Sequence, residues 1–170
     1  MTRVTAEALI RDLGLAPHPE GGFFRETHRA PLTIPAGALP AGYAGPRSAA
    51  TAIYYLVTRA SFSALHRLRG DELFHFYLGD PVEMLQLDPG GAGRVVVLGR
   101  DVAAGMHPQV LVPGGTWQGS RVRDGGELAL LGTTMSPGFD GRDFELGRRD
   151  DLLRTHPGFR DTILALTCPG

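Results

Sequence analysis

Apolar and polar residues alternate in short stretches along most of the chain, and this pattern predicts many β-strands. Stretches rich in Val, Leu, Phe, Tyr and Thr are separated by turn sequences such as "RGD", "GDP", "DPGGAG", "PGG" and "DGG". The expected strands cover residues 21–29, 48–58, 62–68, 72–78, 82–88, 94–99, 108–113, 116–122 and 128–136. Because no helix of crossover length separates them, the strands should pair antiparallel in a sandwich or barrel.

Helical patterns occur only at the two ends of the chain. Near the start, Thr5 can cap a short helix with a one-sided apolar stripe, and Gly14 suits the left-handed position that ends it. The sequence "RDDLLRTHPGFRDTILALT" near the other end predicts a minor helix, and the Pro/Gly/Ala-rich residues 30–46 predict a long flap. We therefore expect an all-β fold with a short N-terminal helix, in a single domain over residues 1–170.

Composition and charge narrow the class of protein. The chain has 170 residues, of which 42% are hydrophobic and 21% charged, with a formal net charge of −1. This balance, without a basic block, argues against nucleic acid or an anionic membrane as a main partner. The single cysteine, Cys168, cannot form an internal disulfide, and the N-terminus is too polar for a signal peptide. We expect a soluble, cytoplasmic protein.

Residues 63–80 hold the densest candidate chemistry. They read "SALHRLRGDELFHFYLGD", with two histidines and an Asp-Glu pair among apolar residues. The stretch resembles the first motif of cupin barrels, which is His-any-His, three residues, Glu, six residues and Gly. His66, Glu72 and Gly79 fall on the motif positions, and Leu68 stands in place of the second histidine.

A second resemblance lies downstream and extends to most of the chain. The second cupin motif is Pro-any-Gly-any-any-His, and "PGGTWQ" supplies Pro113, Gly115 and then Gln118 at the histidine position. The stretches "LGLAPHPEGGFFRETHRA", "TAIYYLV", "LHRLRGDELFHFYLGDPVEML", "PQVLVPGGTWQGSR" and "SPGFDGRDFELG" resemble the Cupin-5 family, a cupin group defined as a domain of unknown function. The resemblance implies a double-stranded β-helix (a jelly-roll barrel), commonly dimeric and related in shape to sugar-nucleotide epimerases.

On the cupin template, the strand faces that carry His66 and Glu72 line the barrel interior. Because side chains alternate along a strand, Leu68 shares the face of His66, and Phe74 and Phe76 share the face of Glu72. We expect His66 and Glu72 to point into one pocket with apolar walls and to be the catalytic residues.

Further residues are candidates for ligand binding. Gln118 would bring a third polar group to the pocket, and Trp117 an aromatic platform at its mouth. Only one of Arg25 and Glu26 can face inward unless their strand bulges, and either is a candidate for ligand contact. His75 has the opposite parity to the catalytic carboxylate, so it should face a covering segment or a dimer partner, and it stays a weaker ligand-binding candidate.

Two chemistries fit these residues. In the first, His66, Glu72 and Gln118 bind a divalent metal such as Fe, Mn, Ni or Zn, although an amide is a weak ligand and Leu68 contributes none. In the second, His66 works as a general base without metal, tuned by a nearby carboxylate. We expect no firmly bound metal and no other cofactor, with a divalent metal as the alternative.

The resemblance to the epimerase that inverts the sugar in dTDP-rhamnose synthesis favours the metal-free chemistry. That enzyme is a metal-free cupin with its catalytic histidine at the position of His66, and its "RGFF-any-E" stretch is similar to "GGFFRE" here. However, Gly21 replaces the arginine that grips the nucleotide diphosphate, and the catalytic tyrosine has no counterpart, since the last tyrosine here is Tyr77. An isomerase-like proton abstraction is therefore predicted, without a dTDP-sugar as its substrate.

Three function classes stay open. A small-molecule isomerase or epimerase comes first, a metal-dependent cupin enzyme such as a dioxygenase or lyase second, and a non-catalytic ligand-binding cupin third. The strands "AIYYLV" and "LFHFYL" are apolar on both faces, which a lone small barrel cannot fully bury. We therefore also expect a homodimer packed sheet against sheet.

Overall fold

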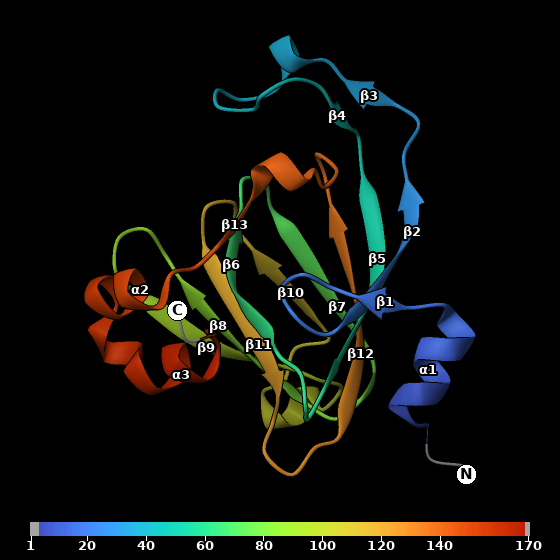
Figure 1. Cartoon of the computed structure of the whole chain (residues 1–170), viewed down its shortest axis with the longest axis vertical. Coiled ribbons are helices and arrows are strands. Elements are labelled where there is room, and N and C mark those ends of the chain that lie inside the picture. Colours follow the sequence, from blue (N-terminus) through green and yellow to red (C-terminus); the bar gives the residue numbers. More distant parts are fainter. Residues whose placement is uncertain (1–3, 169–170) are drawn as a thin grey trace.

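Two antiparallel sheets face each other in a computed structural model that describes residues 4–168 (Figure 1). The first sheet has the strand order β1-β2-β5-β12-β7-β10, and the second has the order β13-β6-β11-β8-β9. The strands are β1 (Ala16–Pro17), β2 (Phe23–Arg29), β3 (Thr33–Ile34), β4 (Arg47–Ser48), β5 (Thr51–Thr58), β6 (Ser63–Leu68), β7 (Glu72–Gly79), β8 (Val82–Leu87), β9 (Gly93–Leu98), β10 (Gln109–Val112), β11 (Trp117–Val122), β12 (Leu128–Met135) and β13 (Phe144–Leu146).

The nine long strands expected from alternation are all present within a few residues of the expected ends, and the named strands pair antiparallel throughout. The all-β prediction is therefore confirmed. The strand β13 was not predicted, because its three residues are too few for a periodic pattern. The pairing of β7 with β12 shifts register between Leu130 and Leu131, so the alternation of β7 changes phase at its far end.

Alternating side chains from both sheets meet in the centre of the barrel. Tyr55, Val57 and Leu131 come from the first sheet and pack with Met84 and Leu98 from the second. All five side chains are almost fully excluded from water. Burial of this apolar area is the main stabilising contribution to the two-sheet arrangement.

Helices cover the outer faces of both sheets, from opposite sides of the barrel (Figure 1). α1 (Ala6–Leu13) begins at Thr5, whose hydroxyl accepts a hydrogen bond from the backbone N–H of Ala8, and ends at Gly14 with a φ of 62°. It packs against the first sheet. α2 (Arg149–Thr155) and α3 (Arg160–Ala165) pack against the second sheet. No helix within residues 4–168 is long and apolar enough to cross a membrane.

The C-terminal segment is also bonded to the backbone of β6. The N–H of Leu65 donates to the carbonyl of Leu166 at 2.8 Å, and the carbonyl of Leu65 accepts from the N–H of Gly147 at 2.7 Å. The side chain of Leu65 packs among Leu152, Ile163 and Leu166. The second sheet and the last helices are therefore one packed unit.

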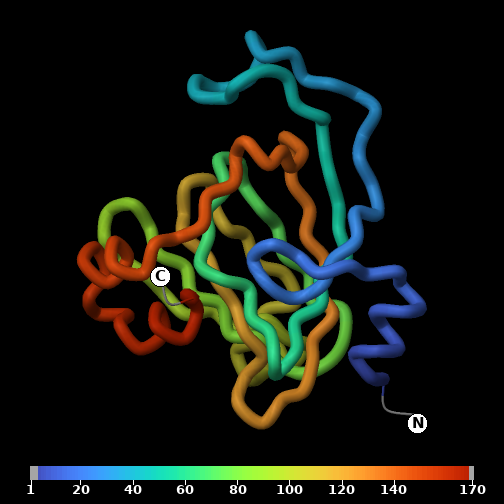
Figure 2. The backbone as a smooth tube through the Cα atoms, viewed as in Figure 1, coloured from blue at the N-terminus to red at the C-terminus, as the bar shows by residue number. Residues whose placement is uncertain are grey.

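The predicted flap forms an arm that projects beyond the barrel (Figure 2). It contains β3, the 3₁₀ turn η1 (Ala36–Ala38) and β4, and most of its residues are exposed. The remaining 3₁₀ turns are η2 (Val102–Ala104), η3 (Gly141–Asp143) and η4 (Pro157–Phe159). The arm is attached at its base, where Arg47 contacts Asp143.

Gly79, at the end of β7, gives a first testable prediction. Its φ is 102°, and a Cβ atom there would lie 2.3 Å from the carbonyl oxygen of Leu128. We expect Gly79→Ala to lower the free energy of unfolding by about 1–3 kcal/mol, because a strained backbone would be combined with a steric clash. Urea unfolding checks this, with Gly105→Ala as control for left-handed strain alone, since a Cβ atom at Gly105 meets no neighbour.

Candidate functional site

A cavity of about 160 Å³ lies at one end of the barrel and is lined by residues from both sheets. Its polar lining comes from two histidines, three glutamates, an arginine, two threonines and a tyrosine, and the rest is apolar. The lining residues are His18, Glu20, Phe24, Glu26, Arg29, Thr51, Ile53, Tyr55, His66, Leu68, Glu72, Phe74, Thr133, Met135, Phe139 and Phe144. The two expected catalytic residues thus lie in one cavity.

His66 is held in a defined orientation on β6. Its ring is 2% exposed and stacks on Phe144, with ring centroids 5.3 Å apart. Nδ1 lies 2.8 Å from the carbonyl oxygen of Ala64. Because a carbonyl oxygen can only accept, Nδ1 carries the proton, and the neutral ring keeps its lone pair on Nε2. This tautomer is the one that a general base requires.

Glu20 is the carboxylate nearest to His66, and the sequence reasoning missed it. Glu20 Oε2 lies 3.2 Å from His66 Nδ1, and Glu20 Oε1 accepts a hydrogen bond from the Ser63 hydroxyl at 2.7 Å. The turn before β2 brings Glu20 inward, and Gly21 permits it, since a Cβ atom there would lie 2.1 Å from the Phe62 carbonyl oxygen. The sequence "HPEGG" contained a signal for this site, because it places a histidine and a glutamate, two residue types common in catalytic sites, next to two glycines that allow a tight turn.

Glu72 is the second buried carboxylate of the cavity, and it is bonded to Gln118. Gln118 Nε2 donates to Glu72 Oε2 at 2.6 Å. Gln118 itself is buried at the register position of β11 opposite His66, but it lies behind the cavity lining. It therefore positions Glu72 rather than meeting a ligand directly.

The pKa values of these groups move in opposite directions. Burial lowers the pKa of His66, and the charge of Glu72 and the hydrogen bond to Ala64 oppose that shift. Burial raises the pKa of Glu20 and the pKa of Glu72, since an ionised carboxylate loses its hydration in the cavity. The cavity therefore holds an imidazole that favours its neutral form, on His66. It also holds two carboxyl groups, on Glu20 and Glu72, that retain their protons more readily than in water.

The raised pKa of Glu72 leads to a prediction about stability and pH. As pH rises above the ordinary pKa of a glutamate, the unfolded chain ionises first, so the wild-type protein loses stability that Glu72→Gln retains. We expect the unfolding free energy of wild type, relative to Glu72→Gln, to fall as the pH rises from about 4 toward neutral. Urea titrations of both proteins across this range check it. A difference that rises with pH would contradict a raised pKa.

The aromatic candidates separate onto different faces. Phe74 lines the cavity, and Phe76 packs against the central core beside it. Trp117 lies on the other face of β11, where Arg67 stacks over its ring at 4.5 Å and the Leu65 cluster packs against it. The register explains this, because Trp117 is paired with Arg67 and is one residue out of phase with the inward Gln118. Trp117 is therefore not part of the cavity.

The remaining candidates lie on β2 and β7. Glu26 lines the cavity, while Arg25 lies outside it with its guanidinium 5.6 Å from the Tyr54 ring centroid. His75 is outside the cavity lining, where Nε2 is 3.0 Å from the Thr134 hydroxyl and Nδ1 contacts Gln109. The inward choice on β2 thus falls on the glutamate.

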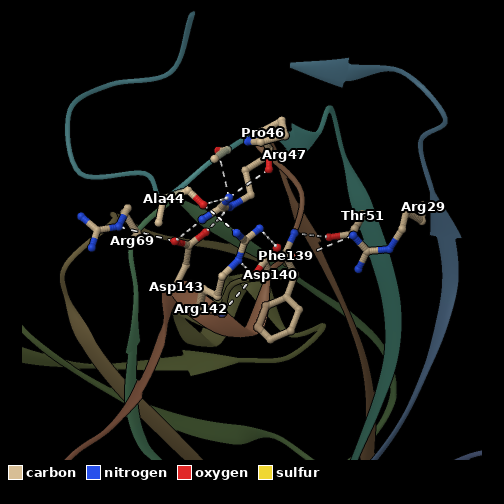
Figure 3. A network of polar contacts seen from close by, with 11 residues as sticks. Arg29, Ala44, Pro46, Arg47, Thr51, Arg69, Phe139, Asp140, Arg142 and Asp143 are labelled. Carbon is tan, nitrogen blue, oxygen red and sulfur yellow. Dashed lines mark hydrogen bonds and ion pairs between the residues drawn. The ribbon is translucent and has the colours of Figure 1, made fainter. Parts of the chain in front are cut away.

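A network of polar contacts, which includes the lining residues Arg29, Thr51 and Phe139, lies beside the base of the arm (Figure 3). Arg29 donates to both carboxylate oxygens of Glu26, at 2.9 and 2.7 Å, and to the carbonyl oxygen of Phe139 at 3.1 Å. Asp140 accepts from Arg142 nearby. The stretch "SPGFDGRDFELG" was part of the family resemblance. That it supplies Phe139 and Phe144 to the cavity was not predicted.

Tyr55 and His18 are among the other lining residues that were not predicted. Tyr55 is buried and donates its hydroxyl proton to the carbonyl oxygen of Gly21 at 2.8 Å. His18 lies against Phe24 and Tyr55 in edge-to-face contacts. Both belong to segments whose hydrophobic pattern indicated only a strand or a turn.

The residues proposed as metal ligands make hydrogen bonds of their own. Within residues 4–168, no group of three or more His, Cys, Asp or Glu side chains is arranged to hold an ion. His66 Nδ1 is taken by a carbonyl oxygen, and the Gln118 amide nitrogen points at Glu72. Gln118 Oε1, the amide atom that could bind a metal, is buried and has no hydrogen-bond partner among the described residues. The expectation of no firmly bound metal therefore stays a prediction.

Comparisons with known proteins agree with this architecture. The family model Cupin_5, described as "Cupin superfamily (DUF985)", matches residues 7–147. The uncharacterized protein YML079W of Saccharomyces cerevisiae is 29% identical over 156 residues, which are 87% of this chain and 78% of that protein.

Solved structures give the same result. Protein SO0799 from Shewanella oneidensis has 33% identity and a TM-score of 0.86, covering 99% of this chain and 100% of that one. A hypothetical protein from Leishmania major has 34% identity and a TM-score of 0.87, covering 98% and 100%. A cupin 2 domain-containing protein from Halorhodospira halophila, at 13% identity and a TM-score of 0.56 over 91% and 88%, shares the fold. The predicted double-stranded β-helix is confirmed.

Proposed function

Since the chain belongs to the Cupin_5 family of the cupin superfamily, we propose that it is a small-molecule-binding cupin with a metal-independent isomerase or epimerase activity. The observation that carries the proposal is the orientation of His66. Its Nδ1 is fixed by the Ala64 carbonyl oxygen, so the neutral ring presents Nε2 as a base in a cavity of small-molecule size.

The chemistry follows from the two kinds of titratable group. His66 Nε2 removes a proton from a carbon next to a carbonyl group, and the electron pair moves onto the carbonyl oxygen. Glu72, whose pKa is raised by burial, supplies a proton to that oxygen. Return of a proton to the carbon and of the oxygen's proton to Glu72 completes the isomerisation without oxidation or reduction.

Cavity size and charge define the substrate class. About 160 Å³ is close to the roughly 150 Å³ of an engineered cavity that holds benzene, so one six-membered ring fills it. Arg29 is the one Lys or Arg side chain in the lining, and Glu26 and the Phe139 carbonyl oxygen already engage it. The favoured substrate is therefore an uncharged, ring-sized carbonyl compound or sugar.

Deuterium exchange tests the activity across many candidate substrates at once. The protein is incubated in D₂O with a panel of uncharged aldoses, ketoses and sugar lactones, and each compound is analysed by NMR and mass spectrometry. One deuterium on the carbon next to the carbonyl group, in at least one compound, is the expected result. Binding in thermal-shift measurements without any incorporation would favour a non-catalytic ligand-binding cupin instead.

A metal-dependent enzyme is the alternative that elemental analysis tests. Protein purified without an affinity tag should contain well under one equivalent of Fe, Mn, Ni or Zn. A stoichiometric metal would replace the base chemistry with metal chemistry and would require His66, Glu72 and Gln118 to rearrange.

The outer face of the first sheet supports the proposal of a homodimer. Tyr77 on β7 is 51% exposed and Leu111 on β10 is 48% exposed, and α1 packs elsewhere on this sheet. A second copy packed sheet against sheet would cover both side chains. Sedimentation at micromolar concentration should give a dimer and Tyr77→Glu a monomer. A wild-type monomer under these conditions would contradict the proposal.

We also propose that the protein is cytoplasmic. Cys168 is exposed and is a free thiol. A reducing compartment suits such a residue, because an exposed thiol is open to oxidation elsewhere.

A further inference from the structure

Two cavities share one pair of residues. Besides the barrel cavity, a second cavity of about 420 Å³ lies at the surface between the turn before β2, the start of β6 and the C-terminal segment. His18 and Glu20 line both cavities. The exposed Cys168 lies on the outer one. His18 and Glu20 therefore form a thin partition between the buried base and the surface.

The polar atoms of this partition form a row with one gap that is slightly too long for a hydrogen bond. His66 Nδ1 lies 3.2 Å from Glu20 Oε2, and the same oxygen lies 3.7 Å from His18 Nδ1. His18 Nδ1 accepts a hydrogen bond from the Glu20 backbone N–H at 3.3 Å, so in the neutral ring its lone pair faces Glu20 and Nε2 carries the proton. The 3.7 Å gap exceeds a hydrogen bond, so one side chain must move slightly for a proton to pass.

We propose that Glu20 and His18 form a proton relay that connects His66 to the outer cavity. The inference rests on the proposed role of His66 as a base. When Nε2 gains a proton, Nδ1 passes its own proton to Glu20, Glu20 passes one to His18 Nδ1, and His18 Nε2 releases one to water. One proton enters and one leaves, and the charge of each group is unchanged. When Nε2 gives its proton back to the substrate, a proton moves along the same row in the opposite direction and restores Nδ1–H against the Ala64 carbonyl oxygen.

The relay solves a problem that the cavity itself creates. A ring-sized ligand fills the barrel cavity, so water cannot reach His66 through the mouth while the ligand is bound. The outer cavity lies on the far side of the partition from the ligand. Burial also raises the pKa of Glu20 and lowers the pKa of His18, which makes their neutral forms accessible as intermediates.

Exchange of the His66 Nδ1 proton with water tests the relay without a substrate. The protein is labelled with ¹⁵N, and the rate of exchange of this proton is measured by NMR. In His18→Phe and in Glu20→Gln, we expect exchange to slow by about tenfold or more, because general acid–base groups are removed from the path. His18→Phe keeps an aromatic ring against Phe24 and Tyr55, and Glu20→Gln keeps an acceptor for Ser63.

A matched control and two possible outcomes decide whether the proton relay exists. His28→Phe removes an exposed histidine that lies on β2 outside the cavity lining, and it should leave the exchange rate unchanged. Unchanged exchange in both relay variants, with backbone amide spectra like those of wild type, would overturn the relay. Should deuterium incorporation into every sugar of the panel fail while the variants slow exchange, the relay stands and the proposed activity falls.

Discussion

Replacing His66 with alanine should lower turnover of any compound that the protein isomerises by about 10²- to 10⁴-fold. The variant loses the one imidazole whose tautomer is fixed by a carbonyl oxygen and whose free nitrogen is available to act as a base in the cavity. Turnover is measured as deuterium incorporation under saturating substrate. His66→Asn, which retains hydrogen-bonding capacity, should be equally impaired, because an amide nitrogen is not a base at neutral pH.

The histidine on the outer face provides the matched control. His75→Ala removes an imidazole that contacts Thr134 and Gln109 and does not line the cavity, so it should keep nearly full turnover. Full turnover by both His66 variants would end the catalytic role of His66. Equal losses in the His66 and His75 variants would indicate a general effect on the fold.

Replacing Asp143 with alanine should lower the free energy of unfolding by about 3–5 kcal/mol. Arg47 is 2% exposed, and its guanidinium donates to both oxygens of Asp143, at 2.6 and 2.9 Å (Figure 3). Its third nitrogen donates to the carbonyl oxygens of Gly45 and Pro46. Without the carboxylate, a buried positive charge has only neutral partners, and that desolvated charge is the origin of the loss.

Urea unfolding of wild type and variant measures this loss. Asp151→Ala is the control, because Asp151 pairs with Arg154 at 3.1 Å on an exposed helix surface, where a salt bridge contributes about 0–1 kcal/mol. A loss below about 1 kcal/mol in Asp143→Ala would mean that water reaches Arg47 in the native protein. Proteolysis within residues 30–46 should also become faster in the variant, because Asp143 anchors the base of the arm.

The strands that could be predicted from the sequence are those with a long enough pattern of alternating side chains. Strands such as β5 and β12 extend for eight residues between turn sequences, so the apolar pattern located them. The absence of crossover helices between the strands implied antiparallel pairing. β13 could not be found in this way, because three residues carry no period, and its pairing with β6 depends on residues far away in the chain.

The candidate site was predictable where its residues lie on regular strands. On the cupin template, parity placed His66 and Glu72 on inward faces. A regular hairpin of β6 with β7 across the tight turn was also expected and is wrong, because the two strands belong to opposite sheets and do not pair. Glu20 lies in a turn, where side-chain direction depends on the φ of glycine and not on a period. Trp117 shows the opposite failure, because parity counted from Gln118 would have placed it outside. It was chosen because aromatic side chains at a pocket mouth commonly serve as ligand platforms.

The bonds between Leu65 and the C-terminal segment give the last helices a part in tuning the site. The strand position next to His66 is bonded through its N–H to Leu166 and through its carbonyl to Gly147. A substitution in α3 can therefore displace the imidazole through the backbone while every cavity residue stays the same. The family match ends at residue 147, so these helices lie outside the part of the chain that the family model covers. In protein engineering, α3 is therefore a place from which the position of the imidazole can be altered without changing a cavity residue.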